Sequence, residues 1–217
     1  MSDATGTSRA GRPRRFEADD ELRLLFDAAL TAMARNGYQD VAVADILAEA
    51  GLSTRSFYRH FESKDELLCA LYRREAELAA ERLRAKVAAA PNPRLALDAW
   101  IEEILSFGHH RAKAARVAVL GSAGAMRAEG YLEETRHARA LLVAPLEELL
   151  EAGLRDGTFP LANPAVDAWY VQAVTWAAAS VNPLREAPAL SRADALRTVQ
   201  SFCLRALGAV GLDKGVG

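Results

Sequence analysis

The densest run of hydrogen-bonding and basic side chains in this sequence lies between Gly51 and Leu67, in GLSTRSFYRHFESKDEL. Such side chains donate hydrogen bonds to base edges and to phosphate oxygens, the acceptors that a DNA duplex presents. The candidate donors are Thr54, Arg55, Ser56, Tyr58, Arg59, His60 and Lys64. The chain contains no Gly-rich phosphate loop, paired metal motif or nucleophile elbow. The pattern therefore favours nucleic-acid binding over catalysis.

Helical spacing separates this stretch into two faces. Phe57 and Phe61 lie four residues apart, so they share one face and should pack on the preceding helices. Gly51 ends one helix, and Ser53 can cap the next. The opposite face carries Arg55, Tyr58 and Arg59. Two short helices joined by a tight turn predict a helix-turn-helix whose second helix enters the major groove of DNA.

A further helix start follows directly. Ser63 and Glu66 have the spacing of a capping box, and Lys64 lies in the first turn of the helix that they begin. A lysine beside a helix N-terminus is unfavourable unless an anion docks there. We therefore expect Tyr58, His60 and Lys64 to hold phosphates. Base edges should meet Arg55 and Ser56, assisted by Thr54, and Arg59 could serve either purpose.

The motif Gly-Leu-Ser-x-x-Ser-Phe-Tyr-x-His-Phe-x-x-Lys-x-x-Leu, which begins at Gly51, resembles the signature of the tetracycline-repressor (TetR) family of bacterial transcription regulators. The upstream residues that extend this resemblance are Gly37, Tyr38, Val43, Asp45, Ile46 and Ala50. The resemblance implies a dimer whose larger domain holds a small-molecule cavity. Occupancy of that cavity would change the spacing of the two DNA-reading heads.

The sequence departs from this family's pattern at the start of the second helix. Family members usually carry Ser or Thr near position 42, where this chain has Ala42, and Ala44 replaces a position that is often basic. We expect Asp40 to serve as an earlier cap. Phosphate contacts from this helix are accordingly in doubt, which leaves more of the DNA grip to the third helix and the N-terminal arm.

Composition places the chain among globular proteins. Of its 217 residues 51% are hydrophobic and 26% charged, and the net charge of −2 means that any basic surface must be local. Residues 1–17 are rich in small residues and arginine. We expect a flexible arm whose Arg14 and Arg15 contact DNA, or else a solubilising tail.

Cys69 and Cys203 should be buried thiols in a reducing cytoplasm. No apolar run reaches the ~20 residues of a membrane span, and no signal-peptide core is visible, so the predicted location is cytoplasmic with no membrane partner.

Apolar residues recur with helical period along the whole chain, and no segment alternates with period two. The predicted fold is all-α: an N-terminal three-helix helix-turn-helix domain, joined by a long helix to a C-terminal helical domain for ligand binding and dimerisation. We divide the chain into the arm (1–17), the DNA-binding domain (18–66) and the larger domain (67–217). Helices are expected over residues 20–35, 43–50, after Ser53, 64–88, 93–110, 111–127, 131–155, 164–182 and 191–208. Gly121 and Gly124 should interrupt the sixth of these, and Pro145 should kink or break the seventh.

The last two helices predict a partner. The last carries Leu196, Val199, Cys203, Ala206 and Val210 at spacings of three and four, and the helix before it has apolar residues on two faces. Such a helix is buried either within its own domain or between subunits. We favour a four-helix interface of a homodimer. Its two-fold symmetry would present two recognition helices to a pseudo-palindromic operator, with half-sites about one helical turn (~34 Å) or a small multiple apart.

Aromatic residues at helical spacing suggest a ligand cavity. Trp100, Ile104 and Phe107 share one face, and Trp169 shares a face with Trp176, with Gln172 at its edge. They could line an apolar cavity for a small-molecule effector of unknown identity, although such stripes are also typical of plain core. We expect no cofactor and no metal site. His109 and His110 are adjacent, point about 100° apart on a helix and therefore cannot easily share an ion.

Taken together, these patterns predict a ligand-responsive DNA-binding regulator, a repressor that a small molecule releases from its operator. Two alternatives remain open. One is a DNA-binding dimer without a small-molecule effector, and the other is an α-helical enzyme. An effector would stabilise a regulator and abolish its DNA binding, whereas an enzyme would turn over a substrate.

Overall fold

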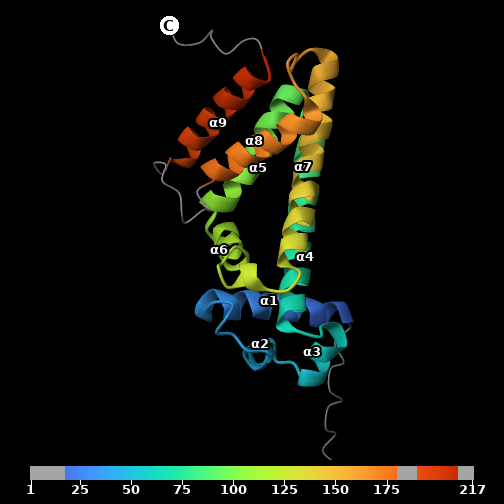
Figure 1. The fold of residues 1–217 in the computed structure, drawn as a ribbon, viewed down its shortest axis with the longest axis vertical. Helices are drawn as coiled ribbons and strands as arrows, with labels where there is room; N and C mark the ends of the chain where they lie inside the picture. Colours follow the sequence, from blue (N-terminus) through green and yellow to red (C-terminus); the bar gives the residue numbers. More distant parts are fainter. Residues whose placement is uncertain (1–17, 180–189, 210–217) are drawn as a thin grey trace, which may run out of the picture.

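The computed structural model describes residues 18–179 and 190–209. Within these residues the secondary structure is entirely helical, which confirms the predicted fold class (Figure 1). The helices are α1 (Ala18–Asn36), α2 (Val43–Ala50), α3 (Thr54–His60), α4 (Lys64–Ala89), α5 (Pro93–His109), α6 (Arg111–Leu120), the 3₁₀ helix η1 (Ala125–Arg127), α7 (Tyr131–Asp156), α8 (Pro164–Ala178) and α9 (Arg192–Ala206). The predicted arm, with Arg14 and Arg15, lies outside the described residues, as does Val210.

Helices α1, α2 and α3 form the N-terminal end of the molecule, with α1 lying across the lower end of α4 and with α2 and α3 beneath it (Figure 1). The turn between α2 and α3 follows the sequence prediction. Gly51 takes a left-handed conformation with φ of +65°, which a side chain would oppose, and Leu52 N–H reaches Leu47 O at 3.1 Å. Ser53 Oγ accepts the Ser56 N–H at 3.2 Å. Phe57 is fully buried, as its spacing predicted.

One predicted helix cap is wrong. Asp40 lies two residues before the N-cap position of α2, which is Ala42. Asp45, in the first turn, reaches back instead, and its carboxylate accepts the Ala42 N–H at 2.8 Å. At α4, Ser63 Oγ accepts the Glu66 N–H at 3.1 Å as predicted. The Glu66 carboxylate, however, accepts the N–H of Glu62 and not that of Ser63.

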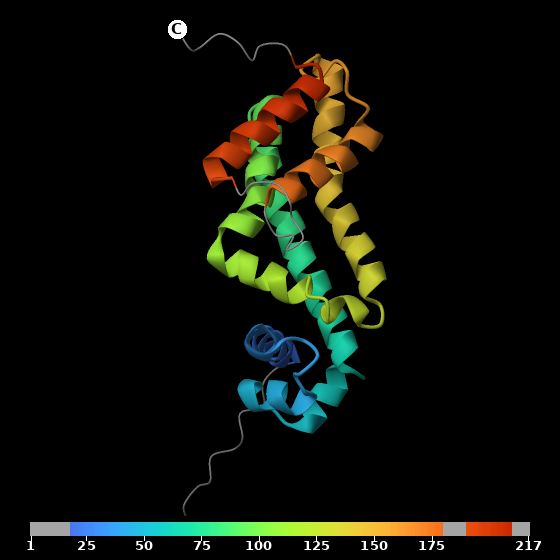
Figure 2. The same ribbon diagram turned by 60° about the vertical axis from the view of Figure 1, so that its left-hand side comes forward.

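The two 26-residue helices α4 and α7 run side by side from the N-terminal end of the molecule to the far end (Figures 1 and 2). Helix α7 continues through Pro145 as one helix, so no break occurs there. A proline removes one backbone hydrogen bond. Burial of Leu142, Leu146 and Leu149 on either side of Pro145 holds the two halves of α7 in the core and offsets this loss.

Two apolar cores divide the molecule. The first joins α1–α3 to Leu67, Leu68 and Leu71 of α4, and it also takes in residues of α6 and η1, among them Val119 and Leu120. The second core lies between α4, α5, α7, α8 and α9 and begins along α4 at Ala79. Helices α4 and α6 therefore contribute residues to both cores.

Helix α8 approaches α5 closely at its C-terminal end. A Cβ atom added to Gly108 would lie 1.5 Å from the carbonyl oxygen of Ala179, so only glycine fits there. Helices α8 and α9 end at Ala178 and Ala206, a few residues before the predicted ends. Among the described residues, no helix has both the length and the apolar character to cross a membrane. Cys69 and Cys203 are buried free thiols, as expected.

Candidate functional site

The outward face of α3 carries three side chains that form no side-chain hydrogen bond or ion pair with the other described residues, although the Tyr58 ring packs edge-on against Phe57. Thr54, Arg55 and Tyr58 are exposed, and Tyr58 retains 59% of its accessible surface. In the part of the chain that the structure describes, Arg55 forms neither a hydrogen bond nor an ion pair. Ser56 is half-buried and lies in the cap of the helix, its Oγ 3.2 Å from Ser53 Oγ. Arg55, Thr54 and Tyr58 are therefore available to an external ligand along one helix face.

The last two basic residues of α3 turn towards α1. Arg59 donates to the carboxylate of Glu21, and His60 Nε2 lies 3.2 Å from Glu21 Oε2. Glu21 is 7% exposed, and its bond with Arg59, aided by His60, lowers the pKa of its carboxyl. The sequence reading missed Glu21. A signal was present, because Glu21 lies one turn before Leu25, on the apolar face of α1, where an acid is unusual.

Lys64 also has partners within the protein. Its ammonium donates to the carbonyl oxygens of Val41 at 2.7 Å and Tyr38 at 2.8 Å, more weakly to Gln39, and lies 4.5 Å from the centre of the Tyr38 ring. Tyr38 Oη in turn donates to Asp65. These bonds tie the α1–α2 loop to the first turn of α4. Nothing in the local sequence signals them, because the partners lie more than twenty residues apart.

A cavity of about 340 Å³ lies between α4, α5, α6, α7 and α8. Two of the six predicted ligand-binding residues, Phe107 and Trp176, line it, with their ring centres 6.0 Å apart. The other four lie elsewhere. Trp100 and Ile104 are fully buried in the core, where Trp100 Nε1 donates to Leu142 O at 3.1 Å. Gln172 is buried, and Trp169 is 44% exposed on the outside of α8.

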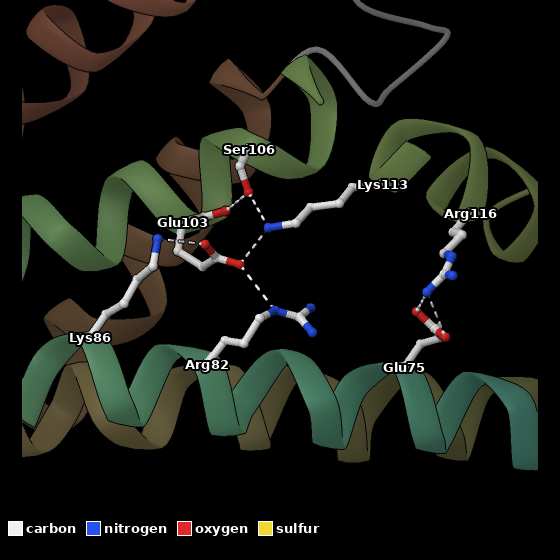
Figure 3. A network of polar contacts seen from close by, with 7 residues as sticks. All are labelled: Glu75, Arg82, Lys86, Glu103, Ser106, Lys113 and Arg116. Atoms are coloured by element: carbon white, nitrogen blue, oxygen red, sulfur yellow. Dashed lines mark hydrogen bonds and ion pairs between the residues drawn. The ribbon is translucent and has the colours of Figure 1, made fainter. Parts of the chain in front are cut away.

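Charged residues from three helices gather beside this cavity (Figure 3). The centre is Glu103 of α5, only 2% exposed. The oxygen atoms of its carboxylate lie 2.6 Å from Lys113 Nζ, 2.8 Å from Lys86 Nζ and 3.3 Å from Arg82 Nε. Lys113 also donates to Ser106 Oγ at 2.7 Å. Burial opposes ionisation of Glu103, but the bonds from Lys113 and Lys86 outweigh it and lower its pKa.

A second ion pair joins α6 to α4 across the cavity wall. Arg116 Nη1 lies 3.1 Å and 3.0 Å from the two carboxylate oxygens of Glu75 (Figure 3). Arg116 also lines a second hollow, about 440 Å³, between α6 and α1, together with Asp27, Leu30 and Thr31. Helix α6 thus forms a partition with the cavity on one side and the first helix of the N-terminal domain on the other.

Helix α8 is apolar on both sides, as predicted, and the two sides have different surroundings. Ala168, Val171 and Thr175 face the core and are buried. Tyr170 is 67% exposed, and Val166 and Trp169 are exposed beside it. Helix α9 adds an exposed Phe202, while its predicted packing residues Val199 and Cys203 are buried, Leu196 is half-buried and Ala206 is exposed. The outer sides of α8 and α9 therefore present large apolar side chains to solvent.

The described residues contain no group of three or more His, Cys, Asp or Glu side chains placed to hold a metal ion. His110 is exposed, and His109 is partly buried at the end of α5. The polar clusters described above consist of ion pairs and hydrogen bonds that bind helices to one another.

Residues 25–71 match the family of bacterial regulatory proteins known as the tetR family. No curated protein sequence matches the chain. Solved structures of the same fold include a transcriptional regulator from Pseudomonas aeruginosa PAO1, with 22% identity, 93% of this chain and 97% of that one covered, and a TM-score of 0.73. Another is a transcriptional regulator from Saccharomonospora viridis in complex with choline (20% identity, 85% and 95% covered, TM-score 0.69). A third is the regulator FadR from Bacillus subtilis in complex with stearoyl-CoA (16% identity, 88% and 99% covered, TM-score 0.63).

These similarities agree with the geometry of the N-terminal end. The matched segment spans most of α1, all of α2 and α3 and the start of α4, which together form the helix-turn-helix domain and its first contact with the long helix. The structural similarity extends over the larger domain as well. Residues 25–71 therefore form a DNA-binding domain of the tetR family of bacterial regulatory proteins, and the chain as a whole has the fold of solved transcriptional regulators.

Proposed function

We propose that the protein is a homodimeric repressor of transcription that binds a pseudo-palindromic operator and leaves it when a small molecule occupies the cavity beside Phe107 and Trp176. The observation that carries the DNA-binding part is the outward face of α3, where Arg55, Thr54 and Tyr58 are exposed and form no side-chain hydrogen bond or ion pair with other described residues. Arg55 can pair with a guanine edge in the major groove, Thr54 can assist, and Tyr58 can reach a phosphate.

Three basic residues that the sequence predicts as DNA contacts, Arg59, His60 and Lys64, have partners within the protein. Arg59 and His60 bond to Glu21, and Lys64 bonds to backbone carbonyls. We therefore assign these three side chains chiefly to holding α3 at a fixed angle, with Arg59, half exposed, able to reach DNA as well. Base reading then depends most on Arg55, because it is the charged side chain of α3 with no competing partner in the described chain.

The exposed apolar side chains of α8 and α9 support the dimer. Tyr170, Trp169 and Phe202 would be removed from water if two copies met about a two-fold axis, and burying large aromatic side chains is the main source of such interface energy. Two copies also provide the two recognition helices that a pseudo-palindromic operator requires.

The effector part rests on the position of the cavity. Helix α4 gives Tyr72, Ala76 and Ala79 to the cavity and gives Leu67 and Leu71 to the core of the DNA-binding domain. A molecule that binds better when α4 is displaced would therefore shift the population towards dimers whose heads are wrongly spaced. Two regulators of the same fold were solved in complex with stearoyl-CoA and with choline, which supports a small-molecule effector for this protein.

The proposal is tested by selecting bound fragments from a random pool of double-stranded DNA with the purified protein. We expect a two-fold symmetric sequence to emerge. Arg55→Ala should weaken binding to it by about 1–3 kcal/mol and relax the preference at one base position in each half-site. Arg155→Ala removes the same charge from an exposed site in the last turn of α7 and should change neither property. Recovery of unrelated sequences with no shared half-site would refute the proposal.

A further inference from the structure

The polar wall of the cavity carries more positive than negative charge. Arg82, Lys113 and Arg116 line it, and Glu75 is the one acid among its lining residues. Lys86 and Glu103 complete the network behind this wall. Four cationic side chains thus share two carboxylates, which leaves an excess of two positive charges within one cluster.

Lys113 is the most shielded of these four cations, with 27% of its side chain exposed, whereas Arg82, Lys86 and Arg116 are 44–50% exposed. Glu103 is nearly inaccessible, so Lys113 must stay close to it, and Ser106 Oγ fixes the same ammonium at 2.7 Å. Lys113 also lies 5.4 Å from the centre of the Phe107 ring, inside the cavity lining. One carboxylate cannot neutralise three cations, and a partly desolvated positive cluster gains most from an added anion.

Apart from Tyr72, the rest of the cavity lining is apolar. Ala76, Ala79, Val117 and Leu142 form its sides, and Phe107 and Trp176 close it near α8. A volume of about 340 Å³ is within the range of pockets for small molecules. The lining therefore has a cationic end between α4 and α6 and a larger hydrocarbon end towards α7 and α8.

We infer that the effector is an amphipathic organic anion, a carboxylate or phosphate ester on an apolar body, whose charged group binds among Lys113, Arg116 and Arg82 and whose body fills the space beside Phe107 and Trp176. This inference rests on the proposed function, since it names the class of ligand for that same cavity. The anion competes with Glu75 for Arg116. Its arrival therefore loosens the one described ion pair between α6 and α4, at the wall that α6 shares with the DNA-binding domain.

The test compares probes that share one ten-carbon chain and differ in charge: decanoate, decyl phosphate, 1-decanol and decyltrimethylammonium. Binding to the purified protein is measured without DNA by calorimetry, below the concentration at which the probes aggregate. We expect at least one of the two anions to bind about tenfold or more tightly than decanol, and the cation to bind no better than decanol. The two anions show whether a carboxylate or a phosphate fits. The inference would be overturned if both anions bound no more tightly than decanol, if the cation bound more tightly than the anions, or if neither anion bound.

Three substitutions locate the charged group. Lys113→Met should weaken binding of the preferred anion about tenfold and leave decanol binding within about twofold. Glu75→Gln removes the competing carboxylate and should strengthen anion binding. Lys86→Met is the matched control, because it removes the same charge from Glu103 but Lys86 does not line the cavity. If Lys86→Met weakens the anion as much as Lys113→Met does, the charged group does not bind at Lys113. Circular dichroism of each variant establishes that it is folded.

Failure here is distinct from failure of the proposed function. DNA selection and the Arg55→Ala variant use no probe, so a protein that selects a symmetric operator but prefers decanol keeps the proposed function and loses the ligand class. Conversely, a protein that binds decanoate through Lys113 but selects no operator keeps the ligand class and loses the repressor. If decanoate binding also lowers operator affinity, both stand.

Discussion

Glu21 Oε2 lies 3.2 Å from Nε2 of His60, so the carboxylate of α1 is hydrogen-bonded to the last residue of α3, the helix that we propose reads DNA. The same carboxylate accepts a hydrogen bond from Arg59. Arg59 and His60, which the sequence predicts as DNA contacts, therefore both bond to an acid within the protein. These contacts tie the C-terminal end of α3 to the start of α1.

We predict that Glu21→Gln lowers the ratio of specific to non-specific DNA affinity by about tenfold. A less firmly held α3 loses base contacts, while removal of one negative charge favours unspecific binding to phosphates. Titration of the selected operator and of unrelated DNA at one salt concentration measures the ratio. Glu49→Gln is the matched control, since Glu49 pairs with exposed Arg35 and forms no hydrogen bond or ion pair with α3 among the described residues. Equal ratios for the two variants would show that Glu21 does not position the helix.

Lys64→Met should destabilise the protein by about 1–3 kcal/mol in urea unfolding, because the carbonyl groups of Tyr38 and Val41 lose a charged donor. The salt dependence of DNA binding should stay unchanged, because the ammonium already has acceptors within the protein. Unchanged stability, with a salt slope reduced by about one unit, would identify Lys64 as a phosphate ligand, as the sequence suggested.

The pH dependence of stability should carry a contribution from Glu103. Its pKa in the folded state lies below the ordinary value of 4.5, so the folded protein binds this proton less readily than the unfolded chain does. The stabilisation is fully present above 4.5 and is lost as the pH falls through the folded pKa. Glu103→Gln should therefore cost about 1–2 kcal/mol at neutral pH, with partly exposed Arg82 and Lys86 limiting the value, and much less in acid. Urea unfolding across this range measures both; a cost that does not depend on pH would contradict the assignment.

Tyr170→Glu combined with Phe202→Glu should convert the dimer to monomers at micromolar concentration and weaken operator binding, because charge is introduced where we place the subunit interface. Light scattering and operator titration measure these effects. Leu132→Glu provides the control, because Leu132 is 62% exposed but lies at the start of α7, away from α8 and α9. A wild-type protein that is monomeric, or a double variant that remains dimeric, would exclude this interface.

Gly108→Ala should destabilise the protein by about 1–3 kcal/mol, although alanine is the better helix former. Its Cβ would lie 1.5 Å from Ala179 O. Because this oxygen belongs to the backbone, a change of side-chain rotamer cannot relieve the clash. Thermal or urea unfolding tests this. Ala118→Gly, at an exposed position of α6, gives the cost of glycine alone. Stability equal to or above that of the parent would mean that α8 shifts away freely.

The local sequence by itself determined the helices and the outward face of α3. Gly51, Ser53 and Ser63 act through bonds within a few residues, so their spacing is enough to predict the turn and the caps. The burial of Phe57 and Phe61 follows from a period of 3.6 residues in the same way. These features need no knowledge of distant parts of the chain.

Only the tertiary structure decided which basic residues are free and where the cavity lies. Glu21 reaches Arg59 across 38 residues, and Lys64 reaches the α1–α2 loop across 23 or more, separations that local periodicity does not encode. Trp100 and Trp176 look alike as helical aromatics, yet one is fully buried in the core and the other lines the cavity. The difference is set by how five helices pack around that space. The charges that give the cavity its sign come from α4, α5 and α6 and meet only when those helices pack together.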